Sequence, residues 1–303
     1  MTPVSGEPAS GRRGWPSWFS PVWLVLGSIS SVQIGSVIAK SLFGQADPMA
    51  IAWLRMVIAL PILFVVARPR VRGRTRAEWA AVLVYGAALA VMNASIYQSF
   101  ARIPVGLAVT IEFLGPLGVA FSGIRRARDL VWVALAAAGV VILGWSPAVW
   151  NWAGIGFALL AAAGWAGYIV AGARVSKTWD GISGVTVGQS VGVVGFAVPG
   201  ILAGGTAMWH PVVLGTAAAV AVLSTVIPYA LEIVALRHIK ASVFGILMSL
   251  EPAVAALAAL IVLHEMLAPA ELVAMACVIV ASIGATRTMG RSGGHGDVSS
   301  QRQ

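Results

Sequence analysis

Long apolar segments recur along this chain, and their length constrains its fold more than any other feature. A helix needs about 20 predominantly apolar residues to cross roughly 30 Å of hydrocarbon at about 1.5 Å per residue. The sequence therefore predicts an all-α integral membrane protein with ten transmembrane helices. They are expected at residues 22–43, 48–67, 79–101, 104–124, 129–147, 153–174, 182–203, 211–236, 241–263 and 269–287.

The composition excludes a soluble globular fold. Hydrophobic residues make up 59% of the chain and charged residues 10%, whereas soluble domains contain roughly 45–50% and about 25%. The net charge of +9 does not indicate nucleic acid binding, because the cations form short clusters between apolar segments. Cys277 is the single cysteine and lies in an apolar segment, so neither an internal disulfide nor a thiolate metal site is expected.

The positions of lysine and arginine predict the orientation, because cytoplasmic loops retain positive charge. Alternate loops and both tails carry the clusters, whereas the intervening loops hold only Arg102, with Lys40 near the end of the first helix. Both termini are therefore predicted to be cytoplasmic, with residues 1–20 and 288–303 as disordered tails. The clustered cations are Arg12, Arg13, Arg68, Arg70, Arg72, Arg74, Arg76, Arg125, Arg126, Arg128, Arg174, Lys177, Arg237, Lys240, Arg287, Arg291 and Arg302.

An internal similarity divides the ten segments into two halves. Residues 101–116 align with residues 237–252, and each copy runs into a helix that carries an acid before a proline. This helix is the fourth of five in each half, so we expect five-helix repeats at 21–147 and 153–287. Because five is odd, the second copy must insert upside down relative to the first, an architecture typical of transporters with a site near the midplane.

Five charged residues lie inside the predicted spans, where a charge costs at least about 2.5–3.5 kcal/mol. They are Lys40, Arg55, Glu112, Glu232 and Glu251. Arg55 and Glu112 are both expected about 10–12 Å below the outer surface, close enough to pair. One interpretation is a structural salt bridge between two helices. The other is a site for a zwitterion, because a guanidinium group matches a carboxylate and a carboxylate matches an ammonium group.

Acids near the midplane are candidates for proton coupling, because burial disfavours the charged form of a carboxyl group. Glu251 stands directly before Pro252, which makes the helix locally irregular. Glu112 and Glu232 are further candidates. A packing helix with a neutral, hydrogen-bonded acid is the alternative for Glu251, and snorkelling toward Arg237 or His238 is the alternative for Glu232.

Amide, hydroxyl and aromatic side chains inside the spans suit a small amphiphilic solute, although hydrogen bonds between helices would also explain them. Glycines 184, 188 and 192 recur at four-residue spacing, which favours close packing inside the molecule, with a homodimer as the alternative. The predicted substrate-binding residues are Gln33, Lys40, Arg55, Asn93, Tyr97, Glu112, Trp165, Tyr168 and Tyr229.

No enzyme site is predicted. His264-Glu265 is reminiscent of a zinc-protease helix, but Ala268 stands where the second histidine would be needed. Neither a P-loop nor a dinucleotide fingerprint is present, so no catalytic residue, metal or cofactor is expected.

Six short stretches carry a family resemblance that extends over residues 22–287. The chain resembles the EamA-type branch of the drug/metabolite transporter superfamily, in particular bacterial threonine and homoserine exporters. His264 departs from the pattern, since the family usually has glycine there. The matching stretches are Ala39–Phe43, Leu54-Arg55, Met92-Asn93 with Tyr97, Ile111–Pro116, Pro228–Glu232 and Leu247–Pro252.

The resemblance implies proton-driven export of L-threonine, L-homoserine and related amino acids across the bacterial inner membrane. Two other functions are compatible with the sequence. An exporter of another amphiphilic metabolite or drug would have the same fold with a different cavity. A non-transporting membrane receptor or assembly subunit would need a partner surface, for which the short loops offer little.

Overall fold

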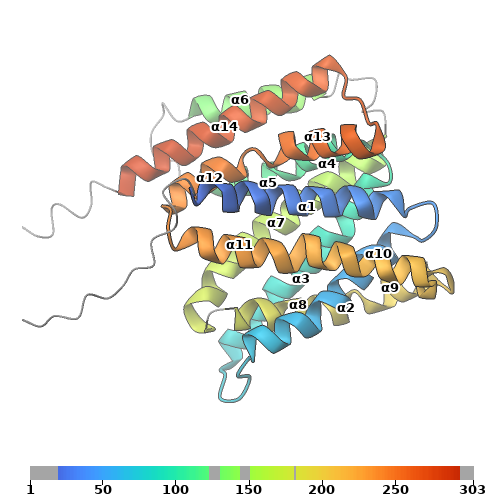
Figure 1. The fold of residues 1–303 in the computed structure, drawn as a ribbon. Helices are drawn as coiled ribbons and strands as arrows, with labels where there is room; N and C mark the ends of the chain where they lie inside the picture. The colour runs from blue at the N-terminus through green and yellow to red at the C-terminus, as the bar shows by residue number, and fades with distance from the viewer. Residues whose placement is uncertain (1–19, 123–129, 144–150, 181, 294–303) are drawn as a thin grey trace, which may run out of the picture.

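The computed structural model describes residues 20–122, 130–143, 151–180 and 182–293. Every regular element in these ranges is helical, and the helices lie side by side along one common direction (Figure 1). Residues 288–293 continue the last helix, and the rest of both predicted tails lies outside the described residues, as do residues 123–129 and 144–150.

Sixteen helical elements make up the described part of the chain. They are α1 (Val22–Ser41), α2 (Pro48–Ala67), α3 (Arg76–Phe100), α4 (Val105–Glu112), α5 (Leu114–Ser122), α6 (Leu130–Leu143), α7 (Trp152–Thr178), α8 (Ser183–Gly195), α9 (Ala197–Gly204), the 3₁₀ turn η3 (Ala207–Trp209), α10 (Pro211–Ala221), the π-helix η4 (Val222–Val226), α11 (Ile227–Leu236), α12 (Ala241–Met248), α13 (Glu251–Leu263) and α14 (Pro269–Gly293).

Helix length and hydropathy identify a multi-pass membrane protein. Eight helical stretches among the described residues are long and apolar enough to cross a bilayer. The pair α8 and α9, bent by 52°, makes a ninth if it is one span, and Leu130–Ile142 is a shorter apolar helix. The ten-span count and the inverted arrangement of two repeats stay predictions.

Local sequence explains where several spans begin. The carboxylate of Asp47 accepts a hydrogen bond from the backbone N–H of Met49 at 2.8 Å, directly ahead of the proline that starts α2. Thr75 and Glu78 form a capping box at the start of α3. The side-chain oxygen of Asn151 caps α7 by accepting a hydrogen bond from the backbone N–H of Gly154 at 3.0 Å. These caps satisfy backbone donors at helix ends that would otherwise have no partner.

The two ends of the bundle differ in charge. The connections α2–α3, α7–α8 and α11–α12 lie at the end where α1 begins and α14 finishes (Figure 1, left). These connections, with the last turns of α7, carry arginine and lysine clusters, so we call this the basic end. The connections α1–α2, α3–α4, α9–α10 and α13–α14 lie at the opposite end. The predicted cytoplasmic cations that lie within the described residues are thus gathered on one side, while the assignment of that side to the cytoplasm stays a prediction.

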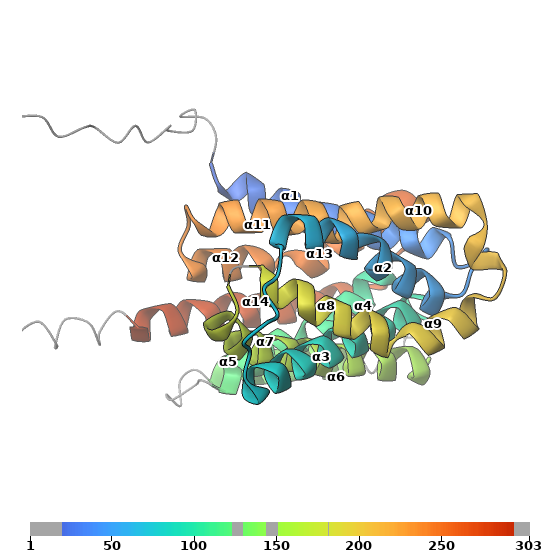
Figure 2. The same ribbon diagram turned by 90° about the horizontal axis from the view of Figure 1, so that it is seen from below.

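Two groups of helices form the walls of the bundle. Figure 2 shows α1 with α10 and α11 along one side and α3 with α6 and α7 along the other. The glycine stripe of α8 packs inside the molecule: an added Cβ at Gly188 would meet the Tyr85 ring of α3, and one at Gly192 would approach Met56 of α2. Close helix packing therefore explains these glycines without a second copy of the chain.

The opposite end is held by an ion pair. Lys40 at the end of α1 lies 2.5 Å from Glu265, which follows α13. Lys40 also donates to the backbone oxygen of Ile103 at 3.0 Å, and Glu265 accepts from the backbone N–H of Val105 at 2.8 Å. These contacts join α1, the α3–α4 connection and the end of α13. His264, where the resemblance predicts glycine, has a φ of 56°, in the left-handed region that glycine adopts most easily.

Candidate functional site

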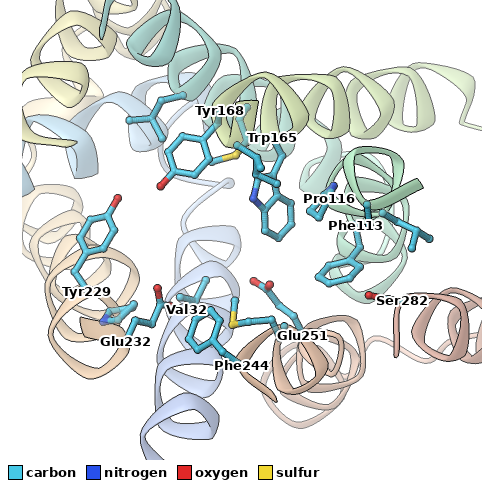
Figure 3. Close-up of a pocket in the computed structure, with 18 of the residues that line it drawn as sticks. Val32, Phe113, Pro116, Trp165, Tyr168, Tyr229, Glu232, Phe244, Glu251 and Ser282 are labelled. Atoms are coloured by element: carbon cyan, nitrogen blue, oxygen red, sulfur yellow. The ribbon is translucent and has the colours of Figure 1, made fainter. Parts of the chain in front are cut away.

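A cavity of about 560 Å³ extends from the middle of the bundle toward the basic end. Its volume falls within the roughly 300–1,000 Å³ of small-molecule sites. The lining residues of α7, α11, α12 and α14 lie at the middle of these spans or in their halves nearest the basic end. Figure 3 shows side chains from several helices facing this space, among them Phe113, Trp165, Tyr168, Tyr229, Glu232, Phe244 and Glu251.

Glu251 reaches the cavity because the span that carries it is broken. Helix α12 ends at Met248, and α13 begins at Glu251 with Pro252 in its first turn. Proline has no backbone N–H, so the carbonyl four residues earlier loses its helical partner. Ser249, inside the break, forms a hydrogen bond of 2.7 Å with Ser282 of α14. Irregular backbone at this depth is tolerated where it lines a cavity or is buried in protein.

Hydrogen bonds from α1 hold both acids of the cavity. Gln33 donates from Nε2 to Oε1 of Glu251 at 3.0 Å, and Ser28 donates from its hydroxyl to Oε1 of Glu232 at 2.6 Å. Glu232 thus faces the cavity with a partner on α1. Its predicted alternative contact with Arg237 is not among the ion pairs of the described residues, which join Lys40 to Glu265 and Arg74 to Glu78 and Asp180.

Two tyrosines close one side of the cavity. The hydroxyl groups of Tyr168 on α7 and Tyr229 on α11 point toward each other in Figure 3. Tyr168 stacks on Tyr85 of α3, with ring centroids 4.7 Å apart. Trp165 lies one turn earlier on α7 and contacts Phe113 edge to face at 5.6 Å. Aromatic rings with polar edges can contact both an apolar side chain and a hydrogen-bonding group of a ligand.

Arg55 lines a second, smaller cavity of about 80 Å³. Its guanidinium group donates to Oδ1 of Asn93, whose own amide donates to the backbone oxygen of Leu89 at 2.8 Å. The guanidinium carbon lies 5.2 Å from the centre of the Tyr97 ring, a cation–π arrangement. Nε of Arg55 is buried and has no hydrogen-bond partner. An anionic ligand would provide a hydrogen-bond acceptor for this unpaired N–H group.

The two cavities share part of their walls. Met92 of α3, Thr225 of η4 and Tyr229 of α11 line both. The π-helical turn at η4 places Thr225 there, and π-helical turns are frequent at functional sites. The hydroxyl of Ser31 on α1 donates to the backbone oxygen of Leu223 in the same turn at 2.6 Å. A solute in the large cavity would therefore lie next to the Arg55 group.

Glu112 occupies a different environment. It ends α4, and all eight residues of α4 are buried. The span breaks at Phe113, and Pro116 follows one turn after the acid. Glu112 does not line either cavity, and the ion pairs of the described residues do not join it to Arg55. The predicted salt bridge between these two side chains is therefore absent from this conformation.

The structure gathers most, but not all, of the predicted site residues. Trp165, Tyr168, Tyr229, Glu232 and Glu251 line the large cavity, with Gln33 bonded to Glu251. Arg55 and Asn93 line the small one with Tyr97 beneath the guanidinium group. Lys40 lies at the opposite end in its ion pair, and Glu112 in packed protein.

Sequence reasoning missed the apolar part of the lining and one amide. Met92, Phe244 and Met248 line the large cavity, but an apolar side chain in a membrane span carries no signal that separates cavity from lipid. Gln189 of α8 lines the small cavity and donates to the backbone oxygen of Met56 at 3.2 Å. An isolated amide in an apolar helix was the signal that could have identified it.

The fold and the cavity define a polytopic membrane protein with a solute-sized chamber between its helices, and comparisons give the family. A model of the EamA-like transporter family matches residues 152–287. Threonine/homoserine exporter RhtA of Escherichia coli (strain K12) is 38% identical over 280 residues, covering 91% of this chain and 94% of the exporter. The exporter of the same name from Salmonella typhimurium (strain SL1344) is 37% identical over 287 residues, 94% and 96% of the two chains.

The chain therefore belongs to the EamA-like transporter family, as its sequence motifs predicted. A crystal structure that is 19% identical aligns with a TM-score of 0.59 over 90% of this chain and 99% of the other, a likeness in fold alone. Homologues that are transporters, together with the bilayer-length helices, place this protein among multi-pass membrane transporters.

Proposed function

We propose that this protein is a secondary active exporter of small amino acids, such as L-threonine and L-homoserine, in the bacterial inner membrane. The observation that carries the proposal is an identity of 37–38% to threonine/homoserine exporters over more than nine-tenths of the chain. The cavity supports it independently, because it brings carboxyl groups close to the shared wall with Arg55.

The chemistry of an amino acid matches these groups. Its carboxylate suits Arg55, whose guanidinium group has an unused buried donor and no ion pair. Its ammonium group suits a carboxylate of the large cavity, Glu251 or Glu232. Hydroxyl and amide groups of Asn93, Tyr168 and Tyr229 suit the hydroxyl of threonine or homoserine. In this arrangement Glu112 does not contact the amino acid, because it is buried in α4 outside both cavities.

Alternating access between two inverted repeats explains the asymmetry between the two ends. The broken span α4–α5 runs from the opposite end to the basic end, whereas α12–α13 runs the other way (Figure 1). This reversal supports repeats at residues 21–147 and 153–287. The cavity extends toward the basic end while Lys40 and Glu265 hold the opposite end. With both termini in the cytoplasm, this conformation would receive the amino acid from the cell interior.

Proton coupling would use an acid that the cavity exposes in one conformation and buries in another. Glu251 suits this role best, because it stands at the helix break and keeps one carboxyl oxygen without a hydrogen-bond partner. Glu232 is the second candidate on the cavity wall, and Glu112 is a third, away from it. Export driven by the proton gradient requires such a group to exchange its proton with water on each side.

A proteoliposome assay tests this function. The purified protein is reconstituted with unlabelled threonine inside, and uptake of labelled threonine by counterflow is measured for the wild type and Glu251→Gln. We expect saturable counterflow in the wild type. In a second measurement a proton gradient is imposed across the liposome membrane without internal threonine, and we expect threonine flux in the wild type and its loss in the variant. Empty liposomes and the fully folded Gly118→Ala variant serve as controls. Wild-type gradient-driven flux in Glu251→Gln would remove this acid from the mechanism.

Aromatic side chains favour one second candidate function, export of another amphiphilic metabolite or drug. Phe113, Trp165 and Phe244 line the cavity with aromatic rings, which also suit a larger apolar group of a ligand. Thermal unfolding in the presence of a panel of amino acids and organic cations separates the two candidates. Stabilisation by cations alone would contradict the amino acid proposal, and stabilisation by threonine and homoserine would support it.

A further inference from the structure

Gln33 and Glu251 are joined by one hydrogen bond, and each has one side-chain oxygen without a hydrogen-bond partner. The amide of Gln33 donates from Nε2 to Oε1 of Glu251 at 3.0 Å. Oε1 of Gln33 and Oε2 of Glu251 are both buried and have no hydrogen-bond partner. The residues are 2% and 7% exposed, so bulk water does not satisfy them. Buried polar atoms normally have a hydrogen-bond partner, so two unpaired oxygens on side chains that already share a hydrogen bond need a common explanation.

A proton on Glu251 provides that explanation. A carboxamide presents one donor and one acceptor side by side, whereas an ionised carboxylate presents two acceptors. An ionised Glu251 can therefore accept only from the N–H of Gln33 and has no proton to donate to the amide oxygen. A protonated carboxyl presents an acceptor and a donor, so that it can accept from Nε2 and donate from Oε2 to Oε1 of Gln33 at once.

We propose that Gln33 is a positioning residue that distinguishes the two protonation states of Glu251. With the proton on Oε2, a cyclic acid–amide pair ties α1 to the start of α13. When the proton leaves, the O–H bond at Oε2 breaks, its electron pair stays on the carboxylate, and a water molecule of the cavity takes up the proton as hydronium. The hydrogen bond from Oε2 to the amide oxygen is lost in this step, while the bond from Nε2 to Oε1 remains. The resulting carboxylate is then free to take the ammonium group of the cargo. This inference rests on the proposed function for its cargo and its proton.

The contact between Ser28 and Glu232 shows why the amide matters. Both contacts come from α1, but a hydroxyl can rotate to donate to an ionised carboxylate or to accept from a protonated one. Ser28 therefore fits either state of Glu232. An amide cannot exchange its donor and acceptor without turning over by half a rotation, so Gln33 fits one state of Glu251 with two hydrogen bonds and the other with one.

Other titratable groups surround this pair in the described part of the chain. Glu232 and Tyr229 on α11 and Tyr168 on α7 line the same cavity. Glu112 lies on α4, which packs against α13. On α1 the further charged group is Lys40, already paired with Glu265 at the end of α13. Helix α14, beyond α12, carries Glu271, Cys277 and Arg287. None of these groups replaces the second hydrogen bond that the pair lacks.

Infrared difference spectroscopy during a pH titration tests the inference without substrate. The carbonyl band of a protonated carboxylic acid moves to higher wavenumber when the acid loses its hydrogen bonds, and Glu251→Gln identifies which band belongs to this residue. We expect Gln33→Leu to shift that band upward. Gln33→Met, which keeps an unbranched side chain, is measured beside it in case one variant fails to fold. Gln98→Leu removes another buried amide, whose oxygen accepts from Arg102 just after the end of α3, and should leave the band unchanged.

A double variant that exchanges the side chains of Gln33 and Glu251 provides the decisive test. The double variant Gln33→Glu with Glu251→Gln keeps one acid and one amide in contact and should restore a band at the wild-type position, now carried by α1. A band that does not move in Gln33→Leu and Gln33→Met would overturn the inference, as would an acid band absent at every pH. Threonine counterflow is measured separately: its absence would contradict the proposed function while a shifted band would still support the pair.

Discussion

The two broken spans each carry an acid before a proline, but at different spacing, and their acids have different surroundings. Glu112 precedes its break and is packed within α4, whose residues are all buried. Glu251 follows its break and lines the large cavity. Because the two spans run in opposite directions, α4 and α13 both belong to the half of the bundle at the opposite end, and they pack against each other. The proline marks where each span breaks, and the spacing between acid and proline places Glu112 before its break and Glu251 after its break.

The contact between these half-helices should be the most sensitive to substitution. An added Cβ at Gly106 would lie 2.7 Å from the Cβ of Ala256 in α13. Gly106→Leu should therefore force α4 away from α13 and cost about 3 kcal/mol or more. Thermal unfolding and size-exclusion profiles measure the loss. Gly118→Leu is the matched control, because an added Cβ there meets nothing within 4 Å; equal losses in both variants would contradict this account of the contact.

Transport should separate the two acids next. We expect Glu251→Gln to reduce gradient-driven threonine flux at least about tenfold, which corresponds to about 1.4 kcal/mol, and Glu112→Gln to reduce it less at equal protein levels. A carbodiimide that reacts with protonated carboxyl groups sharpens the test, since peptide mass spectrometry should find it on Glu251 and not on Glu112. Modification of Glu112 alone would reverse the comparison.

The Arg55 group should affect affinity more than stability. Arg55→Lys keeps the positive charge but loses the planar fork that matches two carboxylate oxygens. We expect threonine binding to weaken roughly tenfold, about 1.4 kcal/mol, with a smaller change in the unfolding temperature. Isothermal titration of threonine and of threonine methyl ester checks it. The ester lacks the carboxylate and should bind both forms of the protein equally; a larger loss for the ester would place the carboxylate elsewhere.

The ion pair at the opposite end should give the smallest effect. Lys40 and Glu265 keep 19% and 17% of their side chains exposed, so the pair is partly solvated. Pairs with access to water contribute about 0.2–1 kcal/mol. Lys40→Met should lower the unfolding temperature slightly and leave the dissociation constant for threonine within about twofold, while Lys40→Glu with Glu265→Lys should recover stability. A strong loss of threonine affinity in Lys40→Met would contradict this account and indicate that Lys40 binds the substrate.

Much of the helical framework was predictable because the bilayer imposes a length. The predicted segments 48–67 and 211–236 coincide with the helical stretches Pro48–Ala67 and Pro211–Leu236. The bend at Phe196 was not predicted, because it depends on contact between helices: an added Cβ at Gly200 of α9 would meet the Trp53 ring of α2. No window along one helix contains that information.

The sequence predicted which charged residues belong to the site, but it did not predict which residues they contact. Arg55, Glu232 and Glu251 stand out because a charge inside the membrane needs a compensating environment. Their partners do not, since Gln33 lies 218 positions from Glu251. The same insertion cost marks Lys40 and Glu112 equally strongly, although the structure places them away from both cavities. The cost of placing a charge in the membrane identifies residues that need a compensating environment. Only the three-dimensional packing shows whether that environment is a cavity or an ion pair.

The π-helical turn Val222–Val226 determines the direction in which the later side chains of this span point around the helix axis. Each residue advances an α-helix by about 100°, and a π-helical turn accommodates one residue more than an α-helical turn. Rewinding this turn into regular α-helix at unchanged chain length would therefore rotate Tyr229 and Glu232 about 100° around the helix axis, away from the cavity. Deleting one residue while the turn becomes α-helical would keep both side chains in their present direction, so the extra residue and the π-helical turn compensate for each other.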